Sequence, residues 1–303
     1  MLPDPKKEKP SSPRLSLLVD MTDPDKVLDE VNLIFQDMFD KGDFTFLSAV
    51  FGDVVALFFG RFPGYKACDT PYHNLKHTTD VFLAMARLVH GAHLQGLALN
   101  EMDVTLGLTA ALMHDTGYIQ KDSETHATGA ELATVHVRRG IAFMQHYLSE
   151  ARSPEMFRGR SEALILCTDL EYPFARLTFS TDVDKTMAQM IAASDLLAQT
   201  ADRNYLEKLP LLFRESQASK TGSFENELGL IEEAPRFNDF MRHRIANELG
   251  GVDRYLRPHF KRRWGIDQNM YQEAIDRSLA YLSAILTTDS GNYHQYFRRI
   301  KGR

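Results

Sequence analysis

With 303 residues, 44% of them hydrophobic and 25% charged, the chain can bury one large core under an ordinary polar surface. Its formal net charge of −6 argues against a broad nucleic-acid or anionic-membrane surface, because both need clustered Lys and Arg. The two cysteines, Cys68 and Cys167, lie far apart, so no disulfide framework is expected and a cytoplasmic setting is predicted. The most apolar stretch, 46–62, carries Asp53 and is interpreted as a core helix, so no membrane span or signal peptide is predicted.

Taken in chain order, the pattern predicts a short tail followed by one helical domain. Residues 1–23 are rich in Pro, Ser and Lys and are interpreted as a flexible tail, and residues 24–303 as a single domain. The sequence around Asp23 suits a helix start, with Val27, Val31 and Ile34 on one face. Further helices are expected at 44–62, 72–90, 101–114, 123–149, 162–170 and 182–203, and then across 205–300 with breaks at Pro210, Gly222, Gly250–Gly251 and Gly265. Because alternating strand patterns are scarce, we expect an all-α fold, a compact multi-helix bundle.

The first candidate site residues form a histidine pair in the segment YHNLKH, at 72–77. His73 and His77 are four residues apart, so a helix would place both imidazoles on one face. By itself the spacing is weak, and two surface or capping histidines are an equally good interpretation of this pair.

His114 and Asp115 follow an almost wholly apolar run, LGLTAALM at 106–113, and precede Gly117, which we expect to end that helix in the left-handed conformation. A charge at the end of a buried helix is costly unless it is paired or binds a metal. A structural ion pair is the alternative interpretation.

Asp195 lies inside another apolar, small-residue helix, with no basic residue between it and Arg203. An unpaired buried carboxylate is expensive, and either a metal or a hydrogen bond to a helix terminus would account for it. Together, His77, His114, Asp115 and Asp195 form a mixed nitrogen and oxygen set suited to Zn, Fe, Mn or Mg.

These residues carry a resemblance to a known family. The order of His, His-Asp and Asp on helices resembles the HD-domain metal-dependent phosphohydrolases. The segment YHNLKHTTDV, at 72–81, is similar to the YHNxxHxxDV signature of the class I cyclic-nucleotide phosphodiesterase catalytic domain. Leu166-Cys167-Thr168-Asp169 and Ala193-Ser194-Asp195-Leu196 are similar to two further motifs of that domain. The resemblance covers about residues 65–205 and extends weakly to 265.

The resemblance implies a two-metal site that hydrolyses a phosphoester. His77, His114, Asp115 and Asp195 would hold the first divalent ion, and Asp115 would bridge to a second. A hydroxide between the ions would attack phosphorus, and His73 would be the general acid. Less directly, the resemblance points to residues around the ligands or the substrate: Tyr72, Asn74, Asp80, His136, Thr168 and Asp169. Of these, Asp80 and Asp169 would orient imidazoles, and His136 would touch the water shell of the second ion or be an ordinary helix histidine.

Two positions depart from the family pattern. Tyr118 stands where the family has a histidine, which puts the second metal's water network in doubt. The segment expected to recognise a purine aligns with Asn247–Gly251, giving Glu248 and Gly251 in place of a glutamine and an aromatic ring. The metal chemistry therefore carries over better than the cyclic-nucleotide substrate.

The leading hypothesis is thus hydrolysis of a small phosphoester, a nucleotide phosphodiester of the 3′,5′-cyclic kind. Three alternatives stay open: a nucleotide phosphomonoesterase, a di-iron oxygenase on an HD fold, and a non-catalytic nucleotide-sensing module. The retained His73 argues against the last, since a structural site needs no proton donor. The expected partner is a small molecule, with no nucleic acid and no membrane. The oligomeric state and the metal identity stay open.

Overall fold

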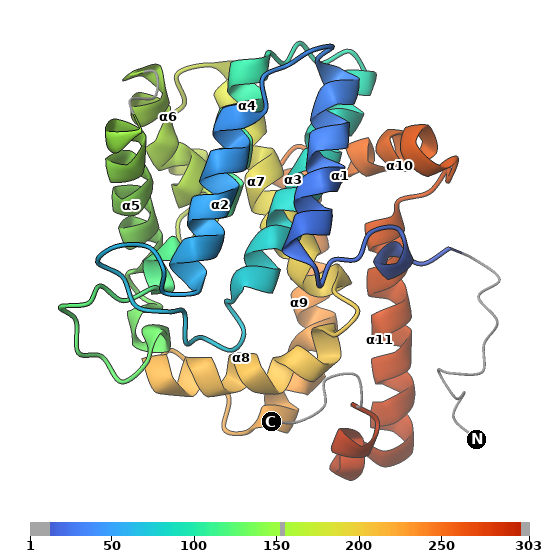
Figure 1. Cartoon of the computed structure of the whole chain (residues 1–303). Helices are drawn as coiled ribbons and strands as arrows, with labels where there is room; N and C mark the ends of the chain where they lie inside the picture. Colours follow the sequence, from blue (N-terminus) through green and yellow to red (C-terminus); the bar gives the residue numbers. More distant parts are fainter. Residues whose placement is uncertain (1–12, 152–154, 298–303) are drawn as a thin grey trace.

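The computed structural model describes residues 13–151 and 155–297, and it confirms the all-α prediction (Figure 1). Among the described residues there is no strand, only an isolated bridge between Tyr65 and Lys121. The α-helices are α1 (Pro24–Met38), α2 (Thr45–Phe58), α3 (Leu75–Leu94), α4 (Glu101–Met113), α5 (His136–Glu150), α6 (Glu155–Leu166), α7 (Asp182–Ala201), α8 (Tyr205–Ser219), α9 (Glu227–Asn247), α10 (Leu256–Trp264) and α11 (Met270–Asp289). Short 3₁₀ helices include η1 (Leu15–Leu17), η2 (Thr116–Tyr118), η3 (Gly129–Leu132), η4 (Phe174–Arg176), η5 (Val252–Tyr255) and η6 (Ser290–Gln295).

Helix α3 is the central element of the bundle. Every residue from position 77 to position 92 is buried, which is typical of a helix covered on all sides. It packs against α7, α1, α4 and α10, and Figure 1 shows α7 beside it in the middle of the molecule. Helix α8 runs across one end of α3 and α7. The ends of α3, α4 and α7 are therefore positioned by a large shared core.

Local capping chemistry sets where several helices begin. Asp23 accepts a hydrogen bond from Asp25 N, which confirms the predicted start of α1. Asn74 caps α3 by accepting from His77 N, and Asn100 caps α4 by accepting from Asp103 N. Because Asn74 is the cap, the predicted helix at 72–90 begins later, at Leu75, and ends at Leu94.

Three further predictions about helix boundaries are wrong. The helix expected at 123–149 begins only at His136, because the chain before it closes into turns and η3, where Gly129 lies against the backbone of Tyr118. The helix expected at 162–170 spans Glu155–Leu166. Pro210 does not break α8, since buried packing of that helix outweighs the lost backbone hydrogen bond. The expected breaks at 250–251 and 265 are confirmed by glycines with positive φ, and Gly222 follows the end of α8.

Residues 13–23, which were predicted to belong to a flexible tail, lie against the core instead. Leu15 is buried in the main core, and Leu18, Val19 and Met21 pack against it. Residues 13–23 therefore belong to the folded body, because their few apolar side chains find partners on other helices. Residues 1–12 lie outside the described part of the chain. None of the described helices is both long and apolar enough to cross a membrane.

Candidate metal centre

Three helices bring four predicted ligands to one point. His77 lies in the first turn of α3, His114 caps the C-terminus of α4, Asp115 begins η2, and Asp195 lies in α7. The close packing of α3, α4 and α7 therefore unites residues that are far apart in the sequence.

The donor atoms of these side chains converge. His77 Nε2 lies 3.4 Å from Asp115 Oδ2 and 3.2 Å from Asp195 Oδ1. His114 Nε2 lies 3.2 Å from Asp115 Oδ2 and 3.8 Å from Asp195 Oδ1. Donors that share a tetrahedral ion at about 2.1 Å stand roughly 3.4 Å apart, so the observed separations match a shared cation.

The hydrogen bonding around the cluster leaves donor atoms free for such an ion. His114 Nδ1 donates to Ala111 O at 2.9 Å, which fixes the tautomer and leaves Nε2 with a lone pair. Although His114 Nε2 and Asp115 Oδ2 are buried, neither has a hydrogen-bond partner among the described residues. A buried nitrogen or oxygen atom without a hydrogen bond destabilises the fold unless an ion or a ligand binds it. These residues therefore fit a divalent metal ion.

The electrostatics of the cluster point the same way. Burial disfavours protonation of His77, but the carboxylates of Asp115 and Asp195 outweigh it and raise the pKa of His77 to about 10. Burial likewise opposes ionisation of Asp115, yet His114 and His77 hold the pKa of that carboxyl well below its usual range. One buried carboxylate, Asp115, and one half-buried carboxylate, Asp195, thus require positive charge beside them, and a divalent cation supplies the same charge as two imidazolium protons.

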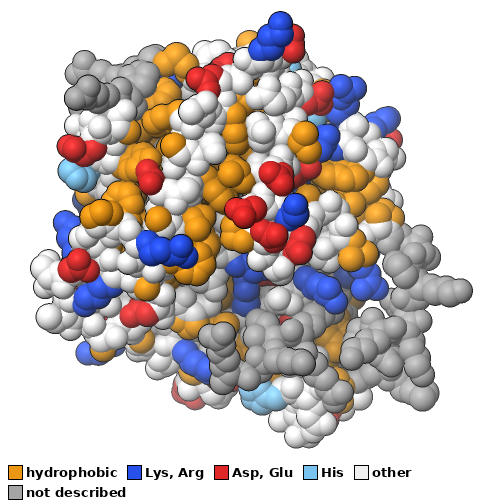
Figure 2. Space-filling view, in the orientation of Figure 1, with side chains coloured by type: hydrophobic (Ala, Val, Ile, Leu, Met, Phe, Trp, Pro, Cys, Tyr) orange, Lys and Arg blue, Asp and Glu red, His pale blue; other side chains and the backbone are white. Residues whose placement is uncertain are grey.

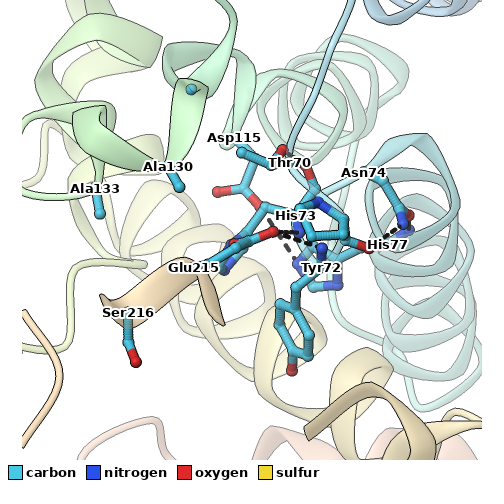
Figure 3. Close-up of polar contacts among 12 residues, drawn as sticks. Thr70, Tyr72, His73, Asn74, His77, Asp115, Ala130, Ala133, Glu215 and Ser216 are labelled. Atoms are coloured by element: carbon cyan, nitrogen blue, oxygen red, sulfur yellow. Dashed lines mark hydrogen bonds and ion pairs between the residues drawn. The ribbon is translucent and has the colours of Figure 1, made fainter. Parts of the chain in front are cut away.

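His73 lies next to the cluster and is anchored by a residue that the sequence did not indicate (Figure 3). Its Nδ1 lies 2.6 Å from Glu215 Oε2, and the other carboxylate oxygen of Glu215 accepts from Tyr72 N at 2.5 Å and His73 N at 3.3 Å. Glu215 is buried and comes from α8, 142 residues away along the chain. Since a carboxylate only accepts, Nδ1 carries the proton.

Tyr118, which stands where the resembled family has a histidine, lies between His73 and His136. Its ring stacks on His73, with centroids 4.5 Å apart and planes 13° apart, and on His136, with centroids 4.3 Å apart and planes 21° apart. His136 Nε2 lies 3.8 Å from Asp115 Oδ1, so His136 reaches the edge of the cluster, and its Nδ1 lies 2.5 Å from Ala133 O. Tyr118 thus fixes the spacing between the two histidines.

Gly117 contributes by its lack of a side chain. The sequence predicted that it would end α4 in the left-handed conformation, which is wrong: it lies inside η2 and has no positive φ. A Cβ atom at this position would stand 1.9 Å from His136 O. Glycine is therefore required because α5 approaches η2 closely, and this contact holds His136 beside Asp115.

The remaining predicted residues make mainly structural hydrogen bonds, although two of them also contact His77: the ring of Tyr72 lies beside its ring, with centroids 6.3 Å apart, and Asn74 accepts from its backbone N–H. Tyr72 donates its hydroxyl to Gln199 Oε1 at 2.8 Å, and Asn74 caps α3. Asp80 does not orient an imidazole as expected, because it pairs with Lys76, whose ammonium also lies 3.3 Å from Asp202. These three predicted residues, Tyr72, Asn74 and Asp80, are therefore placed near the site by α3 and the segment just before it.

The second motif segment and the expected purine-binding segment also have other contacts. Thr168 donates to Ile165 O at 2.9 Å, and Asp169 accepts from Glu171 N at 2.9 Å, so no described hydrogen bond of Asp169 reaches an imidazole. Glu248 lies at the C-terminal cap of α9, 4.0 Å from Arg244. None of its described contacts reaches the cluster.

The protein is therefore an all-helical bundle with a mixed cluster of histidines and aspartates between α3, α4 and α7. The chain belongs to the Npun_R2479-like family, whose model matches residues 62–249. That range contains the four cluster residues, His73 and Glu215. No curated protein and no solved structure matches the chain.

Proposed function

We propose that the protein is a metal-dependent phosphohydrolase acting on a small phosphoester. The observation that carries the proposal is the pair of buried, unpartnered donors, His114 Nε2 and Asp115 Oδ2, facing His77 and Asp195 beside an anchored histidine. His114 Nε2 and Asp115 Oδ2 stand 3.2 Å apart without forming a hydrogen bond, and an ion pair with a purely structural role would have no use for His73.

His77, His114, Asp115 and Asp195 would hold the ion. When bound, a divalent cation polarises a phosphoryl oxygen and lowers the pKa of water, which activates a nucleophile at neutral pH. No Lys or Arg takes part in the described contacts among these four side chains. The cation would therefore also neutralise the charge of an anionic substrate.

His73 would donate the proton to the leaving oxygen. Glu215 accepts the hydrogen bond from Nδ1, so the opposite nitrogen, Nε2, is left for the substrate. The carboxylate also fixes the orientation of the ring, so that Nε2 points away from Glu215. The side chain of His73 is 20% exposed, so a substrate can reach it from solvent. Glu215 is buried and contacts His73 from the protein side.

A nucleotide phosphodiester is the substrate that we propose, because the segment 72–81 resembles the signature of cyclic-nucleotide phosphodiesterases. The departures at Glu248 and Gly251 argue for a different mode of base recognition from that family. A nucleoside monophosphate is the alternative within the same chemistry.

The test is phosphate or nucleoside release from cyclic nucleotides, nucleoside monophosphates and bis-p-nitrophenyl phosphate, with Mn, Mg, Zn or Fe added. We expect turnover by the wild type, little turnover by Asp115→Asn, and a loss of about 100- to 10,000-fold in His73→Ala, the usual contribution of a general acid. His243→Ala, which removes an exposed histidine on α9, is the matched control and should retain full activity. Silence of the metal-loaded wild type on every substrate would refute the proposal.

A further inference from the structure

A pocket lies on the surface between α2 and α5, lined by none of the residues of the metal centre. Its volume is about 290 Å³, which suits a small molecule. It is lined by Asp53, Phe62, Pro63, Tyr65, Phe143, His146, Tyr147, Glu150 and Ala151. Figure 2 shows hydrophobic side chains exposed along the face between α2 and α5.

Three aromatic rings form a corner of this pocket. Phe62 and Tyr65 have centroids 6.0 Å apart and planes at 63°, and Phe62 and Phe143 have centroids 5.8 Å apart, also at 63°. Tyr65 and Phe143 meet at 89°, with centroids 5.5 Å apart. The three rings therefore pack edge to face against one another, with Phe143 buried and Phe62 and Tyr65 partly exposed. The face of each ring carries the negative part of its quadrupole.

A fourth aromatic ring, that of Tyr147, is hydrogen-bonded to a carboxylate of the pocket, Asp53. Tyr147 stacks on Phe143 at 26°, and its hydroxyl donates to Asp53 Oδ2 at 2.6 Å. That bond leaves Asp53 Oδ1 for a ligand. Glu150, one turn after Tyr147 in α5, adds a second carboxylate. The lining residues include two carboxylates, one imidazole (His146) and no Lys or Arg, so the pocket joins aromatic rings with acidic side chains.

We propose that this pocket binds a small methylated ammonium group, as in choline. A cation is favoured over a neutral apolar ligand because two carboxylates and the ring faces all attract positive charge. A methylated ammonium is favoured over a metal ion because the walls are aromatic and offer few oxygen donors. The proposal is independent of the hydrolytic function, since no residue is shared between the two sites.

The test is calorimetric titration of the full-length protein with choline and with 3,3-dimethylbutan-1-ol, in which carbon replaces the charged nitrogen. We expect choline to bind at least ten-fold more tightly than the neutral analogue. Phosphatidylcholine vesicles are the third probe. Binding of free choline assigns the site to a soluble compound, and binding of the vesicles alone assigns it to a lipid headgroup; either result supports an ammonium site.

Two variants locate the binding. Phe62→Leu should weaken choline binding about 5- to 30-fold, the range expected for losing one desolvated cation–π contact, and Asp53→Asn should weaken it as well. Phe59→Leu is the matched control, because Phe59 is an exposed phenylalanine of the same segment that does not line the pocket. Measurable binding of both small probes with equal affinity, equal binding by Phe62→Leu and Phe59→Leu, or no binding of any probe would overturn the proposal. Unchanged melting temperatures would show that the variants fold.

Discussion

Replacing Glu215 by glutamine should disable His73 while leaving the fold and the metal centre in place. The substitution keeps the shape of the side chain and an oxygen that can still accept from the backbone N–H groups of Tyr72 and His73. It places an amide NH₂ or a neutral oxygen where Oε2 now faces His73 Nδ1 at 2.6 Å. Where NH₂ meets Nδ1–H, two donors face each other, so the proton on the ring must move to Nε2.

The magnitude follows from the bond that is lost. A hydrogen bond to a charged group is worth about 1.5–3 kcal/mol, which corresponds to a loss of roughly 10- to 150-fold in turnover when that bond supports the general acid. Because Glu215 is buried, solvent does not replace it. Binding of the metal should be unaffected, since Glu215 does not contact His77, His114 or the two aspartates.

Two measurements check this prediction. Long-range proton–nitrogen NMR reports the tautomer of His73, and steady-state kinetics reports turnover on whichever substrate the wild type hydrolyses. The expected results are a proton moved from Nδ1 to Nε2 and the stated fall in kcat. Glu233→Gln, at an exposed position paired with Arg236, is the matched control. A Glu215→Gln protein with an unchanged tautomer and turnover within three-fold of wild type would refute the role assigned to Glu215.

Two further substitutions test other parts of the account. Gly117→Ala should destabilise the protein by about 1–3 kcal/mol, because its Cβ would stand 1.9 Å from His136 O; Gly52→Ala, in α2 with open space around it, should be neutral or stabilising in the same urea titration. Burial and the nearby Arg87 hold the pKa of His259 well below its usual range, so only the unfolded state takes up that proton below about pH 6.5. Stability should therefore fall on acidification by up to about 1.4 kcal/mol per pH unit from this group, and His259→Gln should reduce that slope between pH 7 and pH 5; an unchanged slope would contradict the assignment.

The features that the sequence predicted well are those set by local chemistry. Asp23 begins α1 because its side chain satisfies a free backbone N–H, and Gly265 ends α10 because it tolerates a positive φ. The four cluster residues were recognised because carboxylates and imidazoles in apolar helices demand a partner. Their convergence needed only that α3, α4 and α7 share one core.

The features that the sequence did not predict depend on contacts between distant segments. Nothing local marks Glu215, an acidic residue in an ordinary helix, as the partner of His73. The late start of α5 likewise follows from the close approach of Gly117 and Gly129 to other backbone, which no helical periodicity reveals. The stacking of Tyr118 between two histidines is of the same kind, since it requires the segment before α3 and the start of α5 to meet η2.

The most direct test of the central claim is the metal content of the protein after loading with Zn or Mn and exhaustive dialysis. The wild type should retain a stoichiometric divalent ion, and Asp195→Asn should retain far less. Asp182→Asn, an exposed aspartate of the same helix α7, should match the wild type. Equal trace amounts of metal in all three proteins would contradict the account, because the buried donors would then have no cation to bind.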